Sequence, residues 1–402
     1  MSELSYLEKL LDGVEVEWKT LEDITLRTSN IKWREVIRSY RYIDLTSVDI
    51  ATKKITETTE ITKNNAPSRA QKLVDENDVI FATTRPTQQR FCLIDSEYAG
   101  EVASTGYCIL RAKQDQVLPK WILHWISTSD FKKHVEENQS GSAYPAISDS
   151  KVKECLIPIP CPDNPEKSLA IQSEIVRILD KFTALTAELT AELTAELTMR
   201  KKQYNYYRDQ LLSFEGGSVE WKSLGEVAII TIGAFIRKDK QNPDADYPVY
   251  NGGRTPTGYY EDFNNDGDKI IVSARGANAG FVNKSSTPYW AGNSCYSISV
   301  RSTEQLHWMY VYYYLKQSET KLTGIQQKGG IPAVSKKQME DLLLPIPSKS
   351  EQVRIVTILD KFDTLTSSIT EGLPREIELR QKQYEYYRDL LFSFPKHETT
   401  SN

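Results

Sequence analysis

Apolar residues recur at helical spacing along the middle of the chain. Between Ser168 and Phe214 they fall at positions 171, 175, 178, 179, 182, 185, 189, 193 and 197, and no glycine or proline interrupts them. Steps of three and four residues place these side chains on one face of an α-helix. The pattern predicts one helix of about 45 residues, roughly 65 Å long.

A second apolar stripe runs from Ser350 to Phe394 and repeats the spacing of the first. It contains Gly372 and Pro374, which should kink or interrupt a helix. Neither stripe is stable in water, and the simplest partner for each is the other. An antiparallel pair of long helices would place two globular domains at opposite ends.

The segments before and between these helices mix strand-like and helical runs. We expect strands at 79–83, 108–111, 270–273 and 297–300, and helices at 120–137 and 304–322. Turn sequences such as Asn251-Gly252-Gly253 separate them. Each segment therefore predicts a compact α/β or α+β domain of about 130 residues.

The chain is internally duplicated. Matching blocks lie 203 residues apart at Val16 and Val219, 190 apart at Asp78 and Asp268, and 187 apart at the Pro-Ala-Ile/Val-Ser and Ile/Leu-Pro-Ile-Pro blocks. They lie 180 apart in the helices, where residues 200–214 and 380–394 share 11 of 15 positions. The helical frame repeats closely while the middle of each copy differs. This is the pattern expected if one scaffold presents two different recognition surfaces.

Three identical Thr-Ala-Glu-Leu units occupy residues 186–197 of the first helix. Each unit adds roughly 6 Å of helix, and a period of four lets the leucine stripe drift slowly around the axis. One interpretation is repetitive helical filler. The other is a ruler that fixes a distance and changes in steps.

Composition narrows the class of protein. No apolar run is long enough for a membrane helix, the N-terminus lacks the apolar region of a signal peptide, and five scattered cysteines show no metal-binding spacing. We therefore expect a cytoplasmic protein with reduced thiols. The net charge of −5 argues against a protein that binds DNA alone, although residues 27–90 hold twelve Lys/Arg against eight Asp/Glu.

No catalytic motif is recognisable. The chain lacks a glycine-rich phosphate loop and the Asn-Pro-Pro-aromatic loop of amino-methyltransferases, and its four histidines have no metal-ligand spacing. His124 and His307 are expected to pack or cap within helical stretches. The sequence predicts a protein without enzymatic activity, cofactor or metal of its own.

The repeated blocks resemble the specificity subunit of type I restriction–modification enzymes, most closely the type IC branch. The blocks that carry the resemblance are Ile-Leu-Asp-Lys-Phe (178–182 and 358–362), Gln-Tyr-x-Tyr-Tyr-Arg-Asp (203–209 and 383–389), the Ile/Leu-Pro-Ile-Pro strands and the Thr-Ala-Glu-Leu units. It covers the whole chain in organisation and is weak inside the two middles.

The resemblance implies a chain that reads double-stranded DNA without catalysing a reaction. Each domain would recognise one half of a bipartite, asymmetric site. The partners would be two methyltransferase subunits, which use S-adenosylmethionine to modify adenine, and motor–nuclease subunits that use ATP and Mg²⁺. An alternative of another class is a scaffold that assembles partner proteins through its helices without reading DNA.

These arguments divide the chain into four parts: a first recognition domain with a short N-terminal helix (1–160), a central spacer helix (161–215), a second recognition domain (216–347) and a C-terminal spacer helix with a tail (348–402). The residues expected to build the spacer and to dock partners are Phe182, Leu185, Leu189, Leu193, Leu197, Tyr204, Tyr207, Phe362, Tyr384 and Tyr387.

The repeat also selects one loop in each domain as a DNA contact. Arg85 and Arg275 share a position in the 190-residue alignment, and an arginine common to both readers suits a phosphate. Gln88, Gln89 and Asn278 have side chains that can pair with adenine edges, so they are the candidates for base readout. The remaining candidates are Thr83, Thr84, Arg90, Arg254, Thr257, Ser273 and Lys328.

Overall fold

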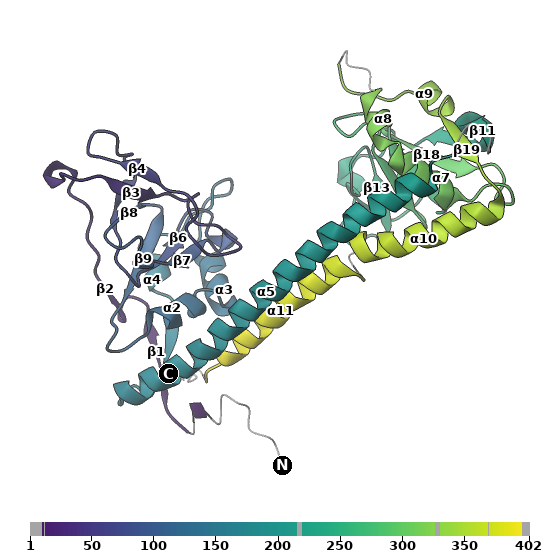
Figure 1. Cartoon of the computed structure of the whole chain (residues 1–402). Helices are drawn as coiled ribbons and strands as arrows, with labels where there is room; N and C mark the ends of the chain where they lie inside the picture. The colour runs from purple at the N-terminus through teal and green to yellow at the C-terminus, as the bar shows by residue number, and fades with distance from the viewer. Residues whose placement is uncertain (1–9, 12, 215–218, 326–329, 369, 396–402) are drawn as a thin grey trace. The chain divides into compact units, whose positions relative to one another are not determined.

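The computed structural model describes residues 10–11, 13–214, 219–325, 330–368 and 370–395 (Figure 1). The chain forms two compact units. Unit 1 combines Met1–Ala191 with Glu378–Asn402, and unit 2 is Glu192–Ile377. Each unit therefore contains parts of both sequence repeats. The short N-terminal helix expected from the sequence and the candidate Lys328 lie outside the described residues, except for 10–11.

Unit 1 is built from three sheets. Its first strand, β1 (Val16–Thr20), pairs antiparallel with its last, β10 (Leu156–Pro160), so two of the repeated sequence blocks meet as neighbouring strands. A four-stranded sheet has the order β2 (Thr25–Leu26), β9 (Tyr107–Ala112), β6 (Val79–Ala82), β7 (Phe91–Leu93). The other has the order β4 (Thr59–Ile61), β3 (Tyr40–Ile43), β8 (Val102–Ser104), β5 (Ala70–Leu73).

Apart from the long helices of the two apolar stripes, the helices described in unit 1 are short. They are η1 (Trp33–Glu35), η2 (Pro86–Gln88), α2 (Pro119–Trp125), α3 (Ser129–Asn138) and α4 (Asp149–Lys153). The single helix expected at 120–137 is wrong, because it divides between α2 and α3. Thr128 adopts an extended backbone there, and its side chain caps α3 by accepting a hydrogen bond from the Phe131 N–H.

Unit 2 repeats this architecture. Strands β11 (Glu220–Ser223) and β19 (Leu343–Ile346) pair as β1 and β10 do. One sheet has the order β12 (Ala228–Ile232), β18 (Cys295–Val300), β15 (Lys269–Ser273), β16 (Val282–Ser285), and the other the order β14 (Gly258–Tyr260), β13 (Tyr247–Tyr250), β17 (Trp290–Ala291). The short helices are α6 (Leu224–Val227), η3 (Lys238–Lys240), α7 (Trp308–Gln317), α8 (Glu319–Gly324) and α9 (Lys336–Glu340).

The helix expected at 304–322 also differs from the structure. It begins later, at Trp308, because the His307 ring nitrogen accepts the Met309 N–H and caps the first turn. It also divides at Ser318, where α7 ends and α8 begins. The predicted cap role of His307 is confirmed, whereas the predicted boundaries are wrong.

The central helix is confirmed as one continuous element, α5 (Pro165–Leu211), of 47 residues. The second stripe forms two helices, α10 (Lys349–Ser367) and α11 (Leu373–Leu391), so the predicted interruption is confirmed. Gly372 has φ +84°, and a Cβ added there would lie 2.5 Å from the Thr364 carbonyl oxygen. Only glycine fits this turn, and Pro374 follows in the first turn of α11, where proline is tolerated.

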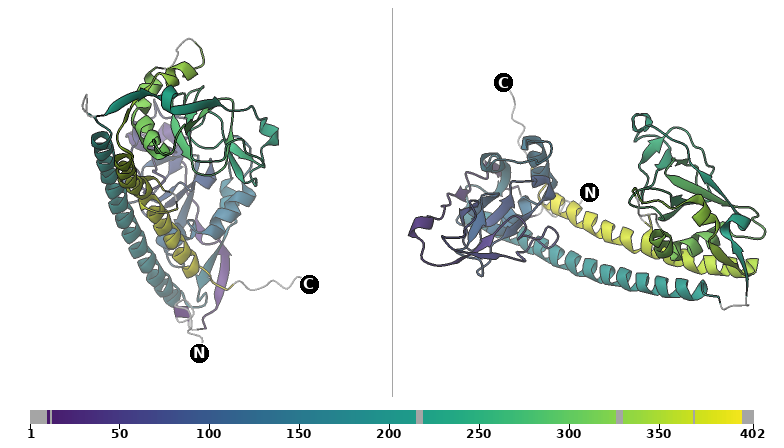
Figure 2. Two further views of the ribbon diagram at one scale, coloured as in Figure 1. Left: turned by 90° about the vertical axis from the view of Figure 1, so that its right-hand side faces the viewer. Right: turned by 90° about the horizontal axis from the view of Figure 1, so that it is seen from above.

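Each unit has its own hydrophobic core, which the long helices help to close. In unit 1 the start of α5 (Ile171, Ile175, Leu179) and the end of α11 both contribute buried side chains. The two helices run side by side within this unit in all views (Figures 1 and 2). In unit 2 the corresponding positions are filled by α10 and by Leu212, which follows α5.

The predicted mixed α and β fold with an internal repeat is therefore confirmed. Among the described residues, no helix combines the length and apolar character needed to cross a membrane.

Candidate nucleic-acid interface

A tight hairpin, residues 83–90, joins β6 to β7 in unit 1 and carries six of the predicted DNA-binding residues. Arg85 and Gln88 are exposed, and Arg85 has φ +50°. The Arg85 guanidinium lies 5.1 Å from the centre of the Tyr144 ring. Arg85 and Gln88 are therefore the predicted residues of the hairpin that solvent, and hence a ligand, reaches most readily.

The other predicted residues of this hairpin serve its internal structure. Thr83 is buried, and its hydroxyl donates a 2.9 Å hydrogen bond to the Gly106 carbonyl. Arg90 donates to the Val48 carbonyl. Thr84 and Gln89 are half-buried, and among the described residues the Gln89 side-chain nitrogen has no hydrogen-bond partner.

Lys53 contacts the same hairpin, although sequence reasoning did not select it. Its ammonium donates to the Gln89 carbonyl and lies 4.2 Å from the centre of the Phe91 ring. Burial lowers the pKa of Lys53 to about 8. No sequence signal distinguishes Lys53, because its position beside the hairpin depends on a contact across 36 residues.

The second hairpin, residues 274–281, joins β15 to β16 in unit 2. Arg275 is exposed on it, and Arg254 and Thr257 are exposed on a neighbouring loop. Asn278 is half-buried; its Oδ1 accepts from Arg254 Nε at 3.3 Å and its amide donates to the Gly252 carbonyl at 3.4 Å. Ser273 is buried, and its hydroxyl lies 3.5 Å from the Gly253 carbonyl oxygen.

Structurally equivalent residues of the two hairpins lie one residue further apart along the chain than the 190 residues of the sequence alignment. The Ile147 N–H donates to the Thr83 carbonyl, and the equivalent Val334 N–H donates to the Ala274 carbonyl, both at 2.9 Å. Thr83 is therefore equivalent to Ala274, an offset of 191. It follows that Arg85 corresponds to Gly276, which also has positive φ, and not to Arg275.

The predicted equivalence of Arg85 and Arg275 is wrong for a physical reason. Strands β6 and β15 each contain a run of consecutive apolar residues, Val79–Ala82 and Ile270–Val272, so the sequence pattern fits either register equally well. The backbone hydrogen bonds of the hairpins distinguish the two. Arg275 corresponds to Thr84. The two hairpins have equivalent backbones, but their arginines occupy different positions on them.

Aromatic residues of the long helices pair between the two repeats. In unit 1, Phe182 of the first repeat stacks on Tyr387 of the second, with ring centres 5.7 Å apart and planes 12° apart. In unit 2, Phe362 of the second repeat stacks on Tyr207 of the first at 5.6 Å and 28°. The equivalent rings thus exchange partners, so each repeat completes the helical frame of the other.

Of the remaining predicted helix residues, Leu185 is 51% exposed and the others, among them Leu189, Leu193 and Leu197, are half-buried. The Tyr384 hydroxyl lies 3.0 Å from the Thr183 hydroxyl in unit 1, and Tyr204 lies 6.5 Å from Phe362 in unit 2. The leucine stripe is therefore only partly covered within each unit.

Comparison with known proteins identifies this duplicated arrangement. Residues 15–199 and 218–379 match the family model described as the type I restriction modification DNA specificity domain. The chain belongs to this family.

Two relatives are specificity subunits of similar length. The chain is 40% identical to the type I restriction enzyme EcoR124I/EcoR124II specificity subunit of Escherichia coli, with all of both chains covered. It is 36% identical to the EcoprrI specificity subunit of Escherichia coli, covering 92% of this chain and 93% of that one. The resemblance inferred from the repeated blocks is confirmed.

Solved structures support the fold of this specificity subunit. One is a chain from a structure describing complex assembly and conformational transition of the type I R-M system, with TM-score 0.69, 24% identity and 94% and 97% coverage. Another is the HsdS subunit from Thermoanaerobacter tengcongensis, with TM-score 0.55, 23% identity and 94% and 96% coverage.

A polar contact to an equivalent aspartate fixes each domain of the specificity subunit to a long helix. In unit 1, Asp180 accepts hydrogen bonds from His124 at 2.9 Å and from Lys120 at 2.6 Å. The bond with His124, followed by that with Lys120, lowers the pKa of Asp180. In unit 2, Tyr313 donates to the equivalent Asp360 at 2.5 Å. The packing role predicted for buried His124 is confirmed.

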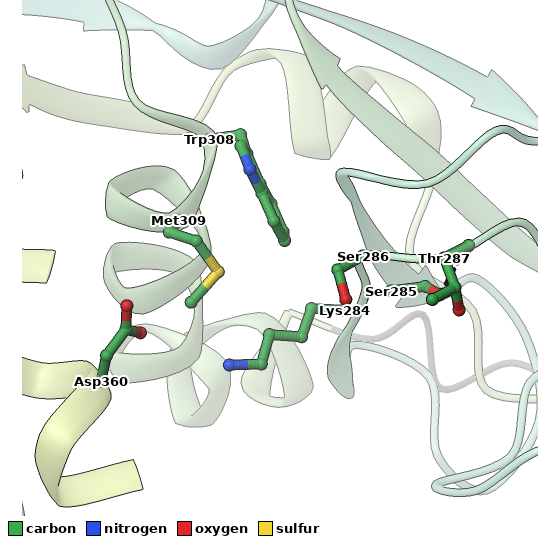
Figure 3. A pocket seen from close by; sticks show the side chains of 7 residues that line it. All are labelled: Lys284, Ser285, Ser286, Thr287, Trp308, Met309 and Asp360. Carbon is green, nitrogen blue, oxygen red and sulfur yellow. Dashed lines mark hydrogen bonds between the residues drawn. The ribbon is translucent and has the colours of Figure 1, made fainter. Parts of the chain in front are cut away.

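An open cavity of 440 Å³ lies in unit 2 of the specificity subunit, between β16, α7 and α10 (Figure 3). Trp308 and Met309 line one side, and Lys284 and Asp360 enter from two other elements. Lys284 is bound to Asp363 at 2.9 Å, and Asp360 is bound to Tyr313. These charges already have internal partners, and none of the predicted DNA-binding residues lines the cavity.

Proposed function

We propose that this specificity subunit reads a bipartite, asymmetric DNA site, with one half-site contacted by each unit. The observation that carries the proposal is the pair of equivalent hairpins, 83–90 and 274–281, built on the same backbone hydrogen bonds but bearing different side chains. A shared backbone positions each reader in the same way, and different side chains give different base preferences.

The exposed arginines and polar groups suit two kinds of DNA contact. Arg85 and Arg275 are exposed and cationic, so each is assigned to a phosphate although they do not occupy equivalent positions, and Gln88 is assigned to base edges because its amide is exposed. Asn278 contributes to bases only after its contacts with Arg254 and Gly252 rearrange.

The acidic chain is proposed to bind DNA as part of a complex. A net charge of −5 gives little sequence-independent attraction to phosphates. Two methyltransferase subunits would clamp the DNA and supply positive surface, while motor–nuclease subunits complete the assembly. These partners would use S-adenosylmethionine, ATP and Mg²⁺, and this chain would direct their activities without catalysing a step. The type IC branch and the cytoplasmic location stay predictions.

Exchange of one recognition domain tests the two-reader proposal. Residues 224–342, which lie between the paired strands β11 and β19, would be replaced by the corresponding segment of a relative. Mapping methylated adenines in cells that carry the chimera and its partners should show one half-site changed, with the other half-site and the spacer retained.

Two results would contradict the proposal. A change at both half-sites would exclude independent readers. Equal binding of the purified wild-type complex to duplexes that differ only at their half-sites would instead favour the interaction scaffold, which has no sequence preference.

We also propose that the Thr-Ala-Glu-Leu units set the spacer between the half-sites. Deleting Thr190–Leu193 from α5 removes roughly 6 Å of helix, comparable to one or two base-pair steps of about 3.4 Å. The preferred spacer should therefore become one or two base pairs shorter while both half-sites stay the same, as read by methylation mapping.

A length-matched control separates the ruler from sequence-specific effects. Replacing the same four residues by alanines preserves the helix length and should preserve the spacer. If the deletion leaves the spacer unchanged, the units are filler and the ruler is excluded.

A further inference from the structure

We propose that Tyr144 in unit 1 and Ile331 in unit 2 are specificity-determining residues whose apolar side chains contact bases of the half-site read by their unit. This inference rests on the proposed function. It adds a second element to each reader, since neither residue lies in the hairpins 83–90 and 274–281.

Both side chains are large, apolar and unusually exposed. Tyr144 is 70% exposed and Ile331 is 77% exposed. Scattered exposed apolar residues are ordinary on a protein surface. These two are distinguished because they occupy equivalent positions, each directly before a repeated Pro-Ala block, although the surrounding loops differ in sequence.

Backbone hydrogen bonds attach each of these residues to its recognition hairpin. The Arg85 N–H donates to the Pro145 carbonyl at 2.7 Å, and the Gly276 N–H donates to the Pro332 carbonyl at 2.9 Å. Tyr144 and Ile331 immediately precede these two prolines. The same connection therefore places an apolar side chain beside the hairpin in both units.

The loop that carries Tyr144 is restrained. Ser140 and Ala146 exchange two backbone hydrogen bonds, of 2.8 and 2.9 Å, that close residues 140–146. Gly141 has φ +94°, and a Cβ there would lie 3.1 Å from the Tyr144 carbonyl oxygen. Because the backbone of this loop is restrained, ordering Tyr144 against a ligand costs less conformational freedom, which favours its use as a contact residue.

The neighbouring charges indicate nucleic acid as the occupant. The Arg85 guanidinium lies 5.1 Å from the Tyr144 ring centre, and both side chains are exposed. Arg275 is also exposed, and it directly precedes Gly276. The Gly276 N–H donates a hydrogen bond to the carbonyl of Pro332, the residue that follows Ile331. An arginine suits a phosphate, and an apolar group beside it suits a thymine methyl in the adjoining groove of duplex DNA.

The test uses the full-length subunit assembled with its methyltransferase partners and a library of duplexes randomised at both half-sites. Tyr144→Ala should reduce the preference for the cognate base by about 10- to 100-fold at one or two positions of one half-site. Ile331→Ala should act in the same way on the other half-site. The salt dependence of binding should be retained, because neither change removes a phosphate contact.

Two further variants provide controls. Arg85→Ala should weaken binding to all duplexes and reduce the salt dependence by about one phosphate contact, without altering base preference. Tyr144→Ile, which installs the residue of the second unit, should alter base preference while the complex still assembles and binds DNA. This variant also tests the inference if the alanine variant fails to fold.

The outcomes separate the inference from the proposed function. Wild-type complex without any half-site preference would overturn both. A wild-type preference that persists unchanged in Tyr144→Ala and Tyr144→Ile would overturn this inference alone. Equal weakening on every duplex would also overturn it, because that result assigns Tyr144 to general DNA affinity.

Discussion

Replacing Arg111 with alanine is expected to lower the free energy of unfolding of unit 1 by about 3–5 kcal/mol, because it leaves a buried carboxylate without its charge partner. Arg111 on β9 donates two hydrogen bonds, of 2.8 and 2.7 Å, to Asp78, whose side chain is fully buried. These bonds raise the pKa of the Arg111 guanidinium. Asp78 directly precedes β6, so the pair also holds the strand that leads into the recognition hairpin.

Hydrogen exchange followed by mass spectrometry measures this effect locally. Amides of β6 and β9 should lose about 10²- to 10⁴-fold protection in Arg111→Ala. The double variant Asp78→Ala/Arg111→Ala should lose less than Arg111→Ala alone, since no buried charge then remains unpaired.

The second unit offers a matched control for this pair. Lys269 is equivalent to Asp78 in the 191-residue register and pairs at 3.0 Å with Asp266, whose side chain is 80% exposed. A solvent-exposed ion pair contributes at most about 1 kcal/mol, so Lys269→Ala should change the stability of unit 2 little. Comparable losses for Arg111→Ala and Lys269→Ala would contradict the argument from burial.

Phe392→Ala is expected to destabilise unit 1 by about 3–5 kcal/mol, although Phe392 belongs to the second sequence repeat. Its ring centre lies 4.6 Å from Trp121 and 5.5 Å from Trp125, and only 4% of the residue is exposed. Removing the ring opens a cavity in the core of the first domain. Protection against hydrogen exchange should therefore fall in α2 and β10, while the amides of β15 and β18 in unit 2 keep theirs.

Two variants calibrate this result. Tyr386→Ala alters a residue that is 63% exposed on α11, the helix that precedes Phe392, and should cost less than about 0.5 kcal/mol. Leu212→Ala changes the position in the first repeat that corresponds to Phe392, and it should destabilise unit 2 because Leu212 lies in that core. If Phe392→Ala instead lowers protection in unit 2 and leaves unit 1 unchanged, the exchange of helix ends between the repeats is wrong.

This exchange explains why the helical blocks of the sequence repeat so closely. Leu212 and Phe392 each pack into a domain encoded by the other repeat, as do the stacked rings Tyr207 and Tyr387 with Phe362 and Phe182. A substitution in one copy must therefore remain compatible with a surface of the other. The hairpins between them carry no such requirement and can differ.

Long-range regularities of this protein were predictable from its sequence. The 47-residue helix α5 follows from an uninterrupted apolar stripe, because helical periodicity repeated over many turns leaves few alternatives. The interruption before α11 follows from Gly372 and Pro374, whose backbone preferences are local properties. The two-domain mixed fold and the family follow from the duplicated blocks, because the duplication is visible in the amino-acid sequence itself.

Tertiary structure decided what depends on contacts between distant segments. The equivalence of Arg85 and Gly276 in the two units is fixed by their backbone hydrogen bonds to residues 145 and 332. The apolar strands alone fit two registers. The burial of Thr83, the exposure of Tyr144 and the position of Lys53 likewise depend on which surfaces face each other. A sequence determines periodic elements through local geometry, but the availability of a side chain for DNA is set by packing that only the folded chain creates.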